Sequence, residues 1–339
     1  MEDLLKRISE KKQRLDKYKP LPEAIVKNLD EWYTVELTYT SNAIEGNTLS
    51  RAETALVIEK GITVEGKTIT EHLEAINHAK ALDFVKTLLS KSRKETTEGE
   101  ILDIHRVILQ KIDDQYAGRY RDVPVRIKGS NHICPNPLKV PQLMQEFYEW
   151  LHSNNPEHIA RIAADAHFKF VSIHPFVDGN GRLSRILMNL LLMQEDYPPA
   201  IIRKEDRRVY IDALENAHNG GSLNDFYRVI YEAVDRSLDI YLETMEPKDG
   251  AEQSVVESIK DLLKIGDLAQ LTGENTVTIR FWTTEGLLDV KENTPGGYRL
   301  FDPKMIDRVK FIQRLKNEER LTLSEIKDRI ERMGRTQTL

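Results

Sequence analysis

At 339 residues the chain exceeds the usual length of one domain, so two or three domains are expected. Its composition, 40% hydrophobic and 31% charged, is that of a globular protein, and no apolar run reaches the roughly 18 residues of a membrane span. The net charge of -6 argues against a surface built throughout to bind nucleic acid, while leaving a local basic face open.

The N-terminus and the cysteine content bear on the cellular compartment. Residues 1–20 are charged throughout and lack the apolar segment of a secretory signal, so we expect a cytoplasmic protein without a membrane partner. Cys134 is the only cysteine, which excludes an intramolecular disulfide and a thiol-based zinc site.

Apolar residues recur at intervals of three and four along most of the chain, which predicts a mainly α-helical fold. The first strong pattern covers residues 22–45 and should end at Gly46, because glycine favours the conformation that closes a helix. A second helix should begin at Ser50. Further helices are expected near 71–89, 141–152, 158–173, 181–194, 206–217 and 224–243.

Two polar stretches predict the domain boundaries. Residues 91–98 read as a surface loop that separates an N-terminal helical region, 1–95, from a central domain, 96–245. Residues 246–250 contain proline and glycine, which is typical of a linker. A third domain is expected at 253–335.

Residues 118–141 interrupt the helical pattern. The stretch Val-Pro-Val-Arg-Ile at 123–127 alternates, Gly129 to Asn131 offers turn chemistry, and 133–135 could return as a second short strand. We therefore expect a β-hairpin inside the central helical domain.

The segment HPFVDGNGRLSR, residues 174–185, lies between two expected apolar helices and is called the catalytic loop below. The first helix should end at His174, because a residue before proline is pushed out of helical geometry. Gly179 and Gly181 let the backbone gather unpaired N–H groups at the start of the next helix, where phosphate binds.

The charged side chains of this loop suit nucleotide chemistry. Arg182 and Arg185 are three apart, so both can reach a polyphosphate from one helix face. Asp178 offers the oxygen ligand that magnesium prefers, and His174 can accept a proton near neutral pH. A capping histidine, an ordinary glycine turn and solvated arginines are the alternatives. Two arginines at the positive end of a helix are nevertheless unfavourable unless an anion binds between them, so their placement favours an anion site.

The catalytic loop resembles the signature of the Fic family, HPFx[DE]GNGRxxR, at every defined position, and the resemblance covers roughly residues 30–243. It implies an enzyme that moves AMP from ATP to a hydroxyl of a target protein. It also implies that His174 deprotonates this hydroxyl and that Asp178 holds Mg²⁺. Phe176 is interpreted as the buried anchor of the loop.

The resemblance also implies the contacts with ATP. The backbone amides of Gly179 to Gly181, together with Asn180, would cradle the phosphates, and Arg182 and Arg185 would hold the outer phosphates that leave as pyrophosphate. Fic proteins carry a β-hairpin flap over the nucleotide, and a target segment could pair with its edge. A solvent-exposed hairpin is the alternative. The remaining residues implied for the ATP pocket are Gly129, Ser130, Asn131 and His132 in the flap, and Tyr210 and His218 on the adenine side.

Residues 41–47, SNAIEGN, resemble the inhibitory motif of the family, [ST]xxxE[GN]. Ser41 and Glu45 are four apart and share a helix face. The resemblance implies that Glu45 pairs with Arg185 and keeps it from the γ-phosphate, so that ATP binds misaligned. In some relatives the same glutamate helps to remove AMP, so Glu45 could be a brake, a hydrolytic residue, or both.

The C-terminal region resembles a MerR-type winged helix-turn-helix through IGDLAQLTG, TIRFWTTEGLL and GYRLFD. Helices are expected at 267–272 and 275–284, followed by a turn at 293–297 and a wing strand at 298–301. The implied DNA contacts are Arg280 and Arg299.

Charge supports DNA binding only locally. Acidic and basic residues are equal in number over 251–339, whereas 291–316 holds seven Lys and Arg against three Asp and Glu. A module for dimer or partner contacts is the alternative.

Three functions are left open. The leading one is an ATP- and Mg²⁺-dependent protein adenylyltransferase, with self-modification as an option and a homodimer implied by the resemblance. The second is a Doc-like phosphotransferase, although both arginines and the complete GNGR run favour AMP transfer. The third is a DNA-binding regulator that uses the nucleotide pocket as a sensor.

Overall fold

The computed structural model describes residues 1–245, 262–293, 299–317, 321, 325–327 and 329. The chain divides into two compact units, Met1–Met245 and Glu246–Leu339. The expected linker at 246–250 and the expected domain start at 253 lie outside the described residues.

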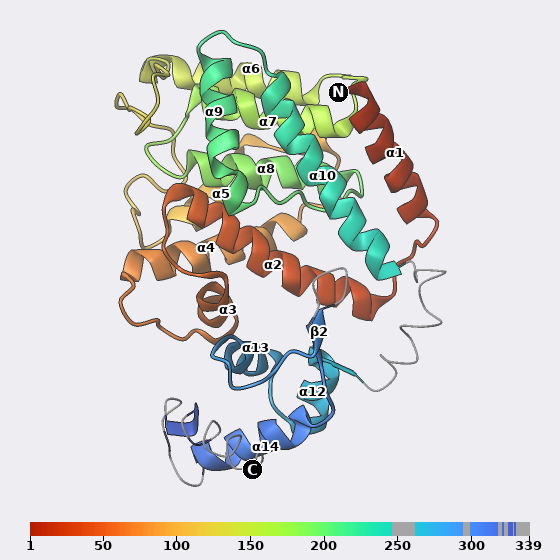
Figure 1. Ribbon diagram of the computed structural model, residues 1–339. Helices are drawn as coiled ribbons and strands as arrows, with labels where there is room; N and C mark the ends of the chain where they lie inside the picture. The colour runs from red at the N-terminus through yellow and green to blue at the C-terminus, as the bar shows by residue number, and fades with distance from the viewer. Residues whose placement is uncertain (246–261, 294–298, 318–320, 322–324, 328, 330–339) are drawn as a thin grey trace. The chain divides into compact units, whose positions relative to one another are not determined.

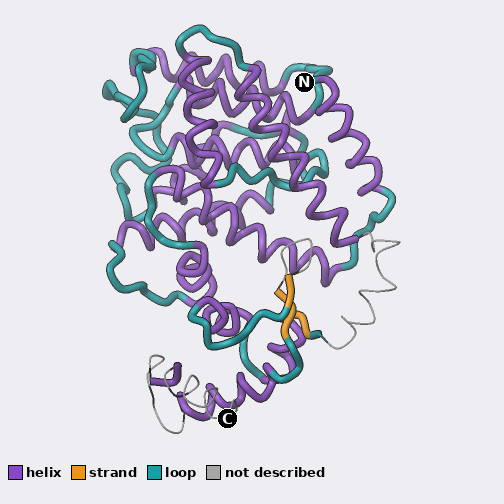
Figure 2. Tube along the Cα trace, in the orientation of Figure 1, coloured by secondary structure: helices purple, strands orange, loops and turns teal. Residues whose placement is uncertain are grey.

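Regular structure in the first unit is helical, as Figures 1 and 2 show. The helices observed near the expected ranges begin and end within a few residues of them, whereas α1 and α5 were not expected. Residues 91–97 of the expected loop form a connection that contains one short 3-10 turn, Arg93–Glu95, and residue 98 already begins α5. The α-helices are α1 (Glu2–Asp16), α2 (Glu23–Glu45), α3 (Arg51–Lys60), α4 (Ile69–Lys86), α5 (Glu98–Leu109), α6 (Val140–His152), α7 (Ile159–Ile173), α8 (Asn180–Gln194), α9 (Arg207–His218) and α10 (Asn224–Met245).

Helix α8 forms the centre of this unit. Its run of leucine, isoleucine and methionine is apolar on nearly all sides, and such a helix is stable only when neighbours cover it. Helices α7, α4, α5 and α2 pack against it. The start of α8, and with it the catalytic loop, is therefore placed by the core.

The N-terminal helix belongs to the same compact unit. Ile8 and Leu15 are buried where α1 packs along α10, and both Arg7 and Lys11 pair with Asp235 at 2.8 Å. The regions expected at 1–95 and 96–245 thus share one core.

Strong local signals fix the ends of the helices next to the site. Gly46 adopts a left-handed conformation, with φ of 104°, and ends α2 where expected. Ser50 forms a capping box with Glu53 at the start of α3, and Thr68 forms one with Glu71 at the start of α4.

The expected β-hairpin is not formed as a pair of strands. Residues 118–141 are all described and contain no strand. One turn is closed by a hydrogen bond from Ser130 N to Ile127 O at 3.2 Å, and a short 3-10 helix, Pro137–Lys139, precedes α6. An isolated two-stranded ribbon is marginally stable at best, and Pro124 and Pro135 each lack the N–H that a ladder needs. The segment is called the flap below.

The second unit contains the expected helix-turn-helix. Helices α12 (Ile265–Thr272) and α13 (Thr276–Thr284) flank Gly273, and Asn275 caps α13 through Thr278 N. Leu268, Trp282 and Phe301 are buried in its core, against which α14 (Met305–Asn317) also packs.

A small sheet completes this unit. Strands β1 (Leu263–Lys264), β3 (Arg299–Phe301) and β2 (Glu292–Asn293) pair in that order, and both pairs are antiparallel. The expected wing strand is therefore present over 299–301. Residues 294–298, which include most of the expected turn, lie outside the described part of the chain.

In the described ranges, no helix combines the length and the apolar character that crossing a membrane would require.

Candidate active site

His174 ends α7 and begins the catalytic loop. Its backbone is left-handed, with φ of 51° and ψ of 60°, and its N–H donates to Phe170 O at 3.0 Å. This conformation is unfavourable for a residue other than glycine and persists where the surroundings impose it, as they often do at functional sites.

Buried contacts hold the loop in this shape. Phe176 is fully buried and stacks on His105, with ring centroids 3.6 Å apart, so it anchors the loop as expected. The Asn180 side chain accepts a hydrogen bond from Phe176 N at 3.0 Å and donates one to Phe176 O at 2.9 Å. The Asn180 side chain thus shapes the loop, and the expected contact of its backbone amide with a phosphate stays a prediction.

His105, on α5, is a supporting residue that the sequence analysis did not identify. Gly118 N donates to its Nδ1 at 3.0 Å, so its proton lies on Nε2, which donates to Asp178 O at 2.9 Å. Burial lowers the pKa of His105 to about 4 and keeps the ring neutral.

The electrostatics of His174 suit a general base. Burial, together with the positive charge of Arg121 and the neighbouring His132, lowers its pKa to about 4, although the backbone of Val171 and, to a smaller extent, Glu45 oppose this shift. Its Nδ1 is buried, so Nε2 is the ring nitrogen that a bound hydroxyl could reach. The ring is therefore neutral at pH 7.

Glu45 covers the start of α8. Gly179 is the N-cap residue, with φ of 78°, and no side chain caps the helix. A Cβ atom at Gly181 would clash with Oε1 of Glu45, so the carboxylate lies against the first turn. The free amides of a helix start attract anions, and here the Glu45 carboxylate is the anion that lies against them.

The structure brings Ser41, Glu45 and Arg185 together. Arg185 Nη2 donates to Glu45 Oε1 at 2.7 Å and to Ser41 O at 2.9 Å, and Nε donates to Ser41 Oγ at 3.0 Å. Burial alone would lower the pKa of Arg185, but the charge of Glu45 raises it. The arginine is thus held charged by the residues of the inhibitory motif.

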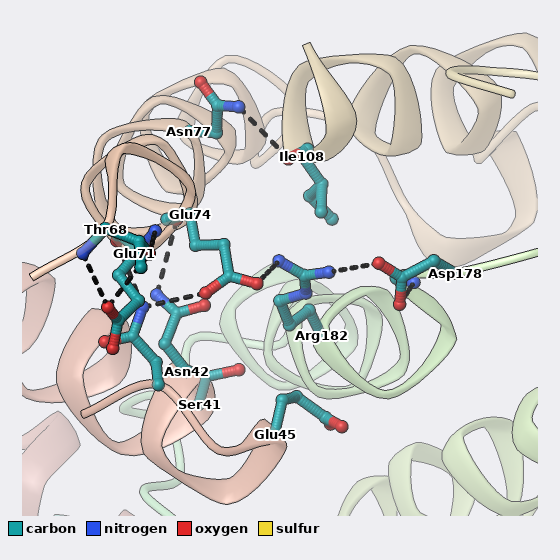
Figure 3. Close-up of polar contacts among 12 residues, drawn as sticks. Ser41, Asn42, Glu45, Thr68, Glu71, Glu74, Asn77, Ile108, Asp178 and Arg182 are labelled. Atoms are coloured by element: carbon teal, nitrogen blue, oxygen red, sulfur yellow. Dashed lines mark hydrogen bonds and ion pairs between the residues drawn. The ribbon is translucent and has the colours of Figure 1, made fainter. Parts of the chain in front are cut away.

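Arg182 is held by two carboxylates. Its Nη1 donates to Glu74 Oε1 at 3.1 Å and its Nη2 donates to Asp178 Oδ2 at 3.0 Å, as Figure 3 shows. Glu74 lies on α4 and carries no signal in the sequence that distinguishes it from other helical glutamates. The two arginines of the loop therefore pair with different acids.

Asp178 fits a magnesium ion that also binds phosphate oxygens. Its side chain is 63% exposed, and its Oδ1 accepts the N–H of Gly179 at 2.6 Å. Within the described ranges no three His, Cys, Asp or Glu side chains cluster to hold a metal by themselves. Magnesium usually takes one or two carboxylates together with substrate phosphates, so a single exposed carboxylate suits it.

The turn of the flap is attached to α9 and α7. Gly129 has φ of 80° in this turn, Glu215 accepts hydrogen bonds from Ser130 Oγ and from Asn131 N, and the pKa of Glu215 is lowered by the Ser130 hydroxyl. His132 donates from Nε2 to Ser172 O at 2.9 Å.

His218 stacks on the flap residue His132, with ring centroids 4.1 Å apart, and on Phe168. Burial lowers the pKa of His218 to about 4. His218 therefore lies at the flap, where its expected contact with adenine stays a prediction.

Arg121 holds the base of the flap. Its guanidinium donates to His174 O at 2.8 Å, to Val123 O at 3.2 Å and to Pro135 O at 2.6 Å. One side chain thus joins both legs of the flap to the residue that begins the catalytic loop. The sequence carried no signal for this role.

Tyr210 lies behind Arg185. It is fully buried, and its hydroxyl is 2.8 Å from His167 Nε2 and 3.5 Å from Arg185 Nη1. In this position it supports the arginine, and its expected contact with adenine stays a prediction.

Arg280 and Arg299 lie in the second unit, on α13 and on β3 respectively. Arg299 is exposed and Arg280 is partly buried. The structure places one on the expected reading helix and the other on the wing strand.

Comparisons with known proteins agree with this geometry. The model of the Fic/DOC family matches residues 95–192, and that of the MerR HTH family regulatory protein matches residues 263–333. The chain is 37% identical over 243 residues to a protein adenylyltransferase Fic of Nematostella vectensis, covering 71% of this chain and 56% of the relative. The chain is 42% identical over 206 residues to the protein of the same name from Drosophila grimshawi. This match covers 60% of this chain and 42% of that relative. The chain thus spans about half the length of the curated relatives it matches.

Solved structures agree as well. Fic-1 from C. elegans superposes with a TM-score of 0.64 at 33% identity, covering 71% of this chain and 72% of that one. A Fic domain containing signaling protein from Bacteroides thetaiotaomicron gives a TM-score of 0.63 at 26% identity, covering 72% of this chain and all of the other. With the signature loop, the helical core and these likenesses together, the chain belongs to the Fic/DOC family.

Proposed function

We propose that this protein is an adenylyltransferase that moves AMP from ATP to a hydroxyl group of a target protein. The observation that carries the proposal is the arrangement of a neutral His174 beside an uncapped helix start and two buried arginines. The names of the relatives support it, since they are called protein adenylyltransferase Fic.

The proposed reaction uses the residues as follows. His174 Nε2 takes the proton of the target hydroxyl, whose oxygen forms a bond to the α-phosphorus of ATP. The bond from this phosphorus to the bridging oxygen breaks, and pyrophosphate leaves. The amides of Gly179 to Gly181, with Arg182 and Arg185, position the phosphates and offset their charge, which is most of what such a transfer requires.

Asp178 would hold the magnesium ion, which neutralises phosphate charge when it is bound. Its exposed carboxylate next to the helix start is what supports this role.

Glu45 is proposed to act as a brake. Its carboxylate binds Arg185 and covers the helix start, so a triphosphate must displace it before the reacting groups can align. Removal of AMP from a modified target is a further proposed role of Glu45.

The identity of the transferred group tests the proposed function. The Glu45→Gly protein should gain an adenylyl group when incubated with ATP and magnesium, as intact mass and α-labelled ATP would show. The additional substitution His174→Ala should abolish this gain and serves as the control. Label from γ-labelled ATP in its place would overturn AMP transfer in favour of phosphotransfer.

We propose that the second unit binds DNA through Arg280 and Arg299. The match to the MerR family and the local excess of basic residues over 291–316 support this. Selection from a random duplex library by the full chain should enrich a defined sequence, and Arg280→Ala should weaken binding to it. Absence of enrichment would contradict the proposal. The homodimer, self-modification and the cytoplasmic location stay predictions.

A further inference from the structure

Glu74 joins two parts of the site that lie far apart in the sequence. Its Oε1 accepts a hydrogen bond from Arg182 Nη1 at 3.1 Å, and its Oε2 accepts one from Asn47 Nδ2 at 2.8 Å. Asn47 follows Glu45 by two residues, just after the end of α2. Figure 3 shows Glu74 reaching from α4 toward Arg182, with Asp178 on the far side of the guanidinium.

The two acids that hold Arg182 differ in their exposure to solvent. The Arg182 side chain is 3% exposed, that of Glu74 is 19% exposed, and that of Asp178 is 63% exposed. Ion pairs with exposed partners contribute little, whereas a buried arginine that loses its partner is strongly destabilised. Glu74 is therefore the stronger of the two anchors.

In the proposed function, magnesium would weaken the ion pair between Asp178 and Arg182. If Asp178 binds magnesium, its carboxylate is shared with the metal and holds Arg182 less firmly. Arg182 Nε is already buried without a hydrogen-bond partner in the described part of the chain. Glu74 is then the group left to fix the guanidinium against the phosphates.

We propose that Glu74 is a positioning residue that holds Arg182 in its productive orientation while Asp178 serves the metal. The proposal rests on the proposed function, because it concerns the nucleotide-bound state of that site. Glu74 acts through Arg182 and through the turn at Asn47, and it does not contact the reacting atoms.

Glu71 provides a matched control on the same helix. It lies one turn before Glu74, and its carboxylate accepts hydrogen bonds from the backbone and hydroxyl groups of Thr48 and Thr68. The Thr48 hydroxyl is the largest cause that lowers the pKa of Glu71, to about 2. These four hydrogen bonds stabilise the start of α4 and the turn at Thr48, and none of them involves Arg182.

The experiment compares both residues in the Glu45→Gly protein, where the brake is absent. Glu74→Gln keeps the size of the side chain but offers one acceptor oxygen, so it cannot accept from Arg182 and Asn47 with separate atoms. We expect kcat for AMP transfer to fall on the order of 10- to 100-fold, because small displacements of positioning groups have effects of this size. The KM for ATP should rise by only about 3-fold.

Two comparisons separate positioning from stability. Glu71→Gln should lower the thermal unfolding midpoint while kcat stays within about 3-fold of the Glu45→Gly parent. Glu74→Asp, which keeps the charge, should recover part of the lost kcat. Equal kcat values for Glu74→Gln and Glu71→Gln would overturn the proposal. The same holds if both variants lose kcat and their thermal unfolding midpoints fall by the same amount.

Failure of the proposed function gives a different result. A Glu45→Gly protein that binds ATP but transfers no AMP would contradict adenylyl transfer. In that case, the affinity of the two variants for ATP, measured by calorimetry, tests the role of Glu74. Weaker binding by Glu74→Gln than by Glu71→Gln would support positioning of Arg182, and equal binding would overturn it.

Discussion

Residues 174–179 of the catalytic loop and residues 118–136 of the flap contain no helix or strand, but the two segments are held in different ways. Phe176, Asn180 and His105 fix the loop between α7 and α8 through buried stacking and reciprocal hydrogen bonds. The flap has no strand pairing and is held by Arg121 at its base and by Glu215 at its turn. The groups of the proposed chemistry are thus held by buried contacts, whereas the flap is held by polar contacts and by the stacking of His132 on His218.

The largest effect is expected for a substitution at Phe176, the buried anchor of the catalytic loop. Phe176→Ala should lower the free energy of unfolding by about 3 kcal/mol or more, because it removes a fully buried aromatic ring from the core. Urea titration followed by circular dichroism measures this, and Phe176→Leu should cost less. A loss below about 1 kcal/mol would show that the loop is not held by burial.

Arg121→Lys should have the next largest effect and should act on the flap. An ammonium group cannot donate to three carbonyl oxygens placed around a planar guanidinium. In the Glu45→Gly protein we expect AMP transfer to fall on the order of 10-fold, with faster protease cleavage between residues 121 and 136. Unchanged cleavage and transfer would remove Arg121 from this account.

Glu215→Gln should have a smaller effect on the same segment. Its side chain is partly exposed, and the hydrogen bonds to Ser130 and Asn131 contribute modestly. We expect flap cleavage to increase about 3-fold, with AMP transfer changed by less than that. Asp212→Asn, an exposed acid on the same helix, is the control. Equal cleavage of the two variants would contradict attachment through Glu215.

The smallest effect concerns pH. Because burial lowers the pKa of His174 to about 4, the ring is already neutral at about pH 5.5, where an ordinary histidine would be mostly charged. In the Glu45→Gly protein, kcat/KM should therefore change by no more than about 2-fold between pH 7 and about pH 5.5. A tenfold drop over this range would show an unperturbed base.

The low histidine pKa values also predict acid sensitivity of folding. Below about pH 6.5 the unfolded chain binds protons that the buried rings of His78, His105 and His174 do not bind. Stability should therefore fall as the pH drops from about 6.5 toward about 4. The dependence of kcat/KM on pH is therefore measured only at pH values where circular dichroism shows that the protein is folded.

Most helices of the first unit, although not α1 and α5, could be predicted from the sequence, and so could the place of the catalytic loop between two helices, because their signals are local. Periodicity, Gly46 and the capping residues near Ser50 lie within a few positions of the features that they determine. The signature residues were likewise adjacent in the chain.

The flap and the supporting residues could not be predicted in the same way. Alternation at 123–127 indicated a strand, but a ladder depends on a partner that the sequence does not specify, and Arg121 joins the two legs in its place. His105, Glu74 and Glu215 act on residues 73, 108 and 84 or 85 positions away, so no local pattern reveals them.

The central claim is that the Glu45 carboxylate competes with the triphosphate of ATP for Arg185 and the first turn of α8. The most direct test is the rate of AMP incorporation from α-labelled ATP by Glu45→Gly, relative to the protein with Glu45. We predict an increase on the order of 100-fold, because the substitution frees both Arg185 and the first turn of α8, the two elements proposed to bind phosphate. Equal rates, with both proteins folded and binding ATP, would contradict the claim.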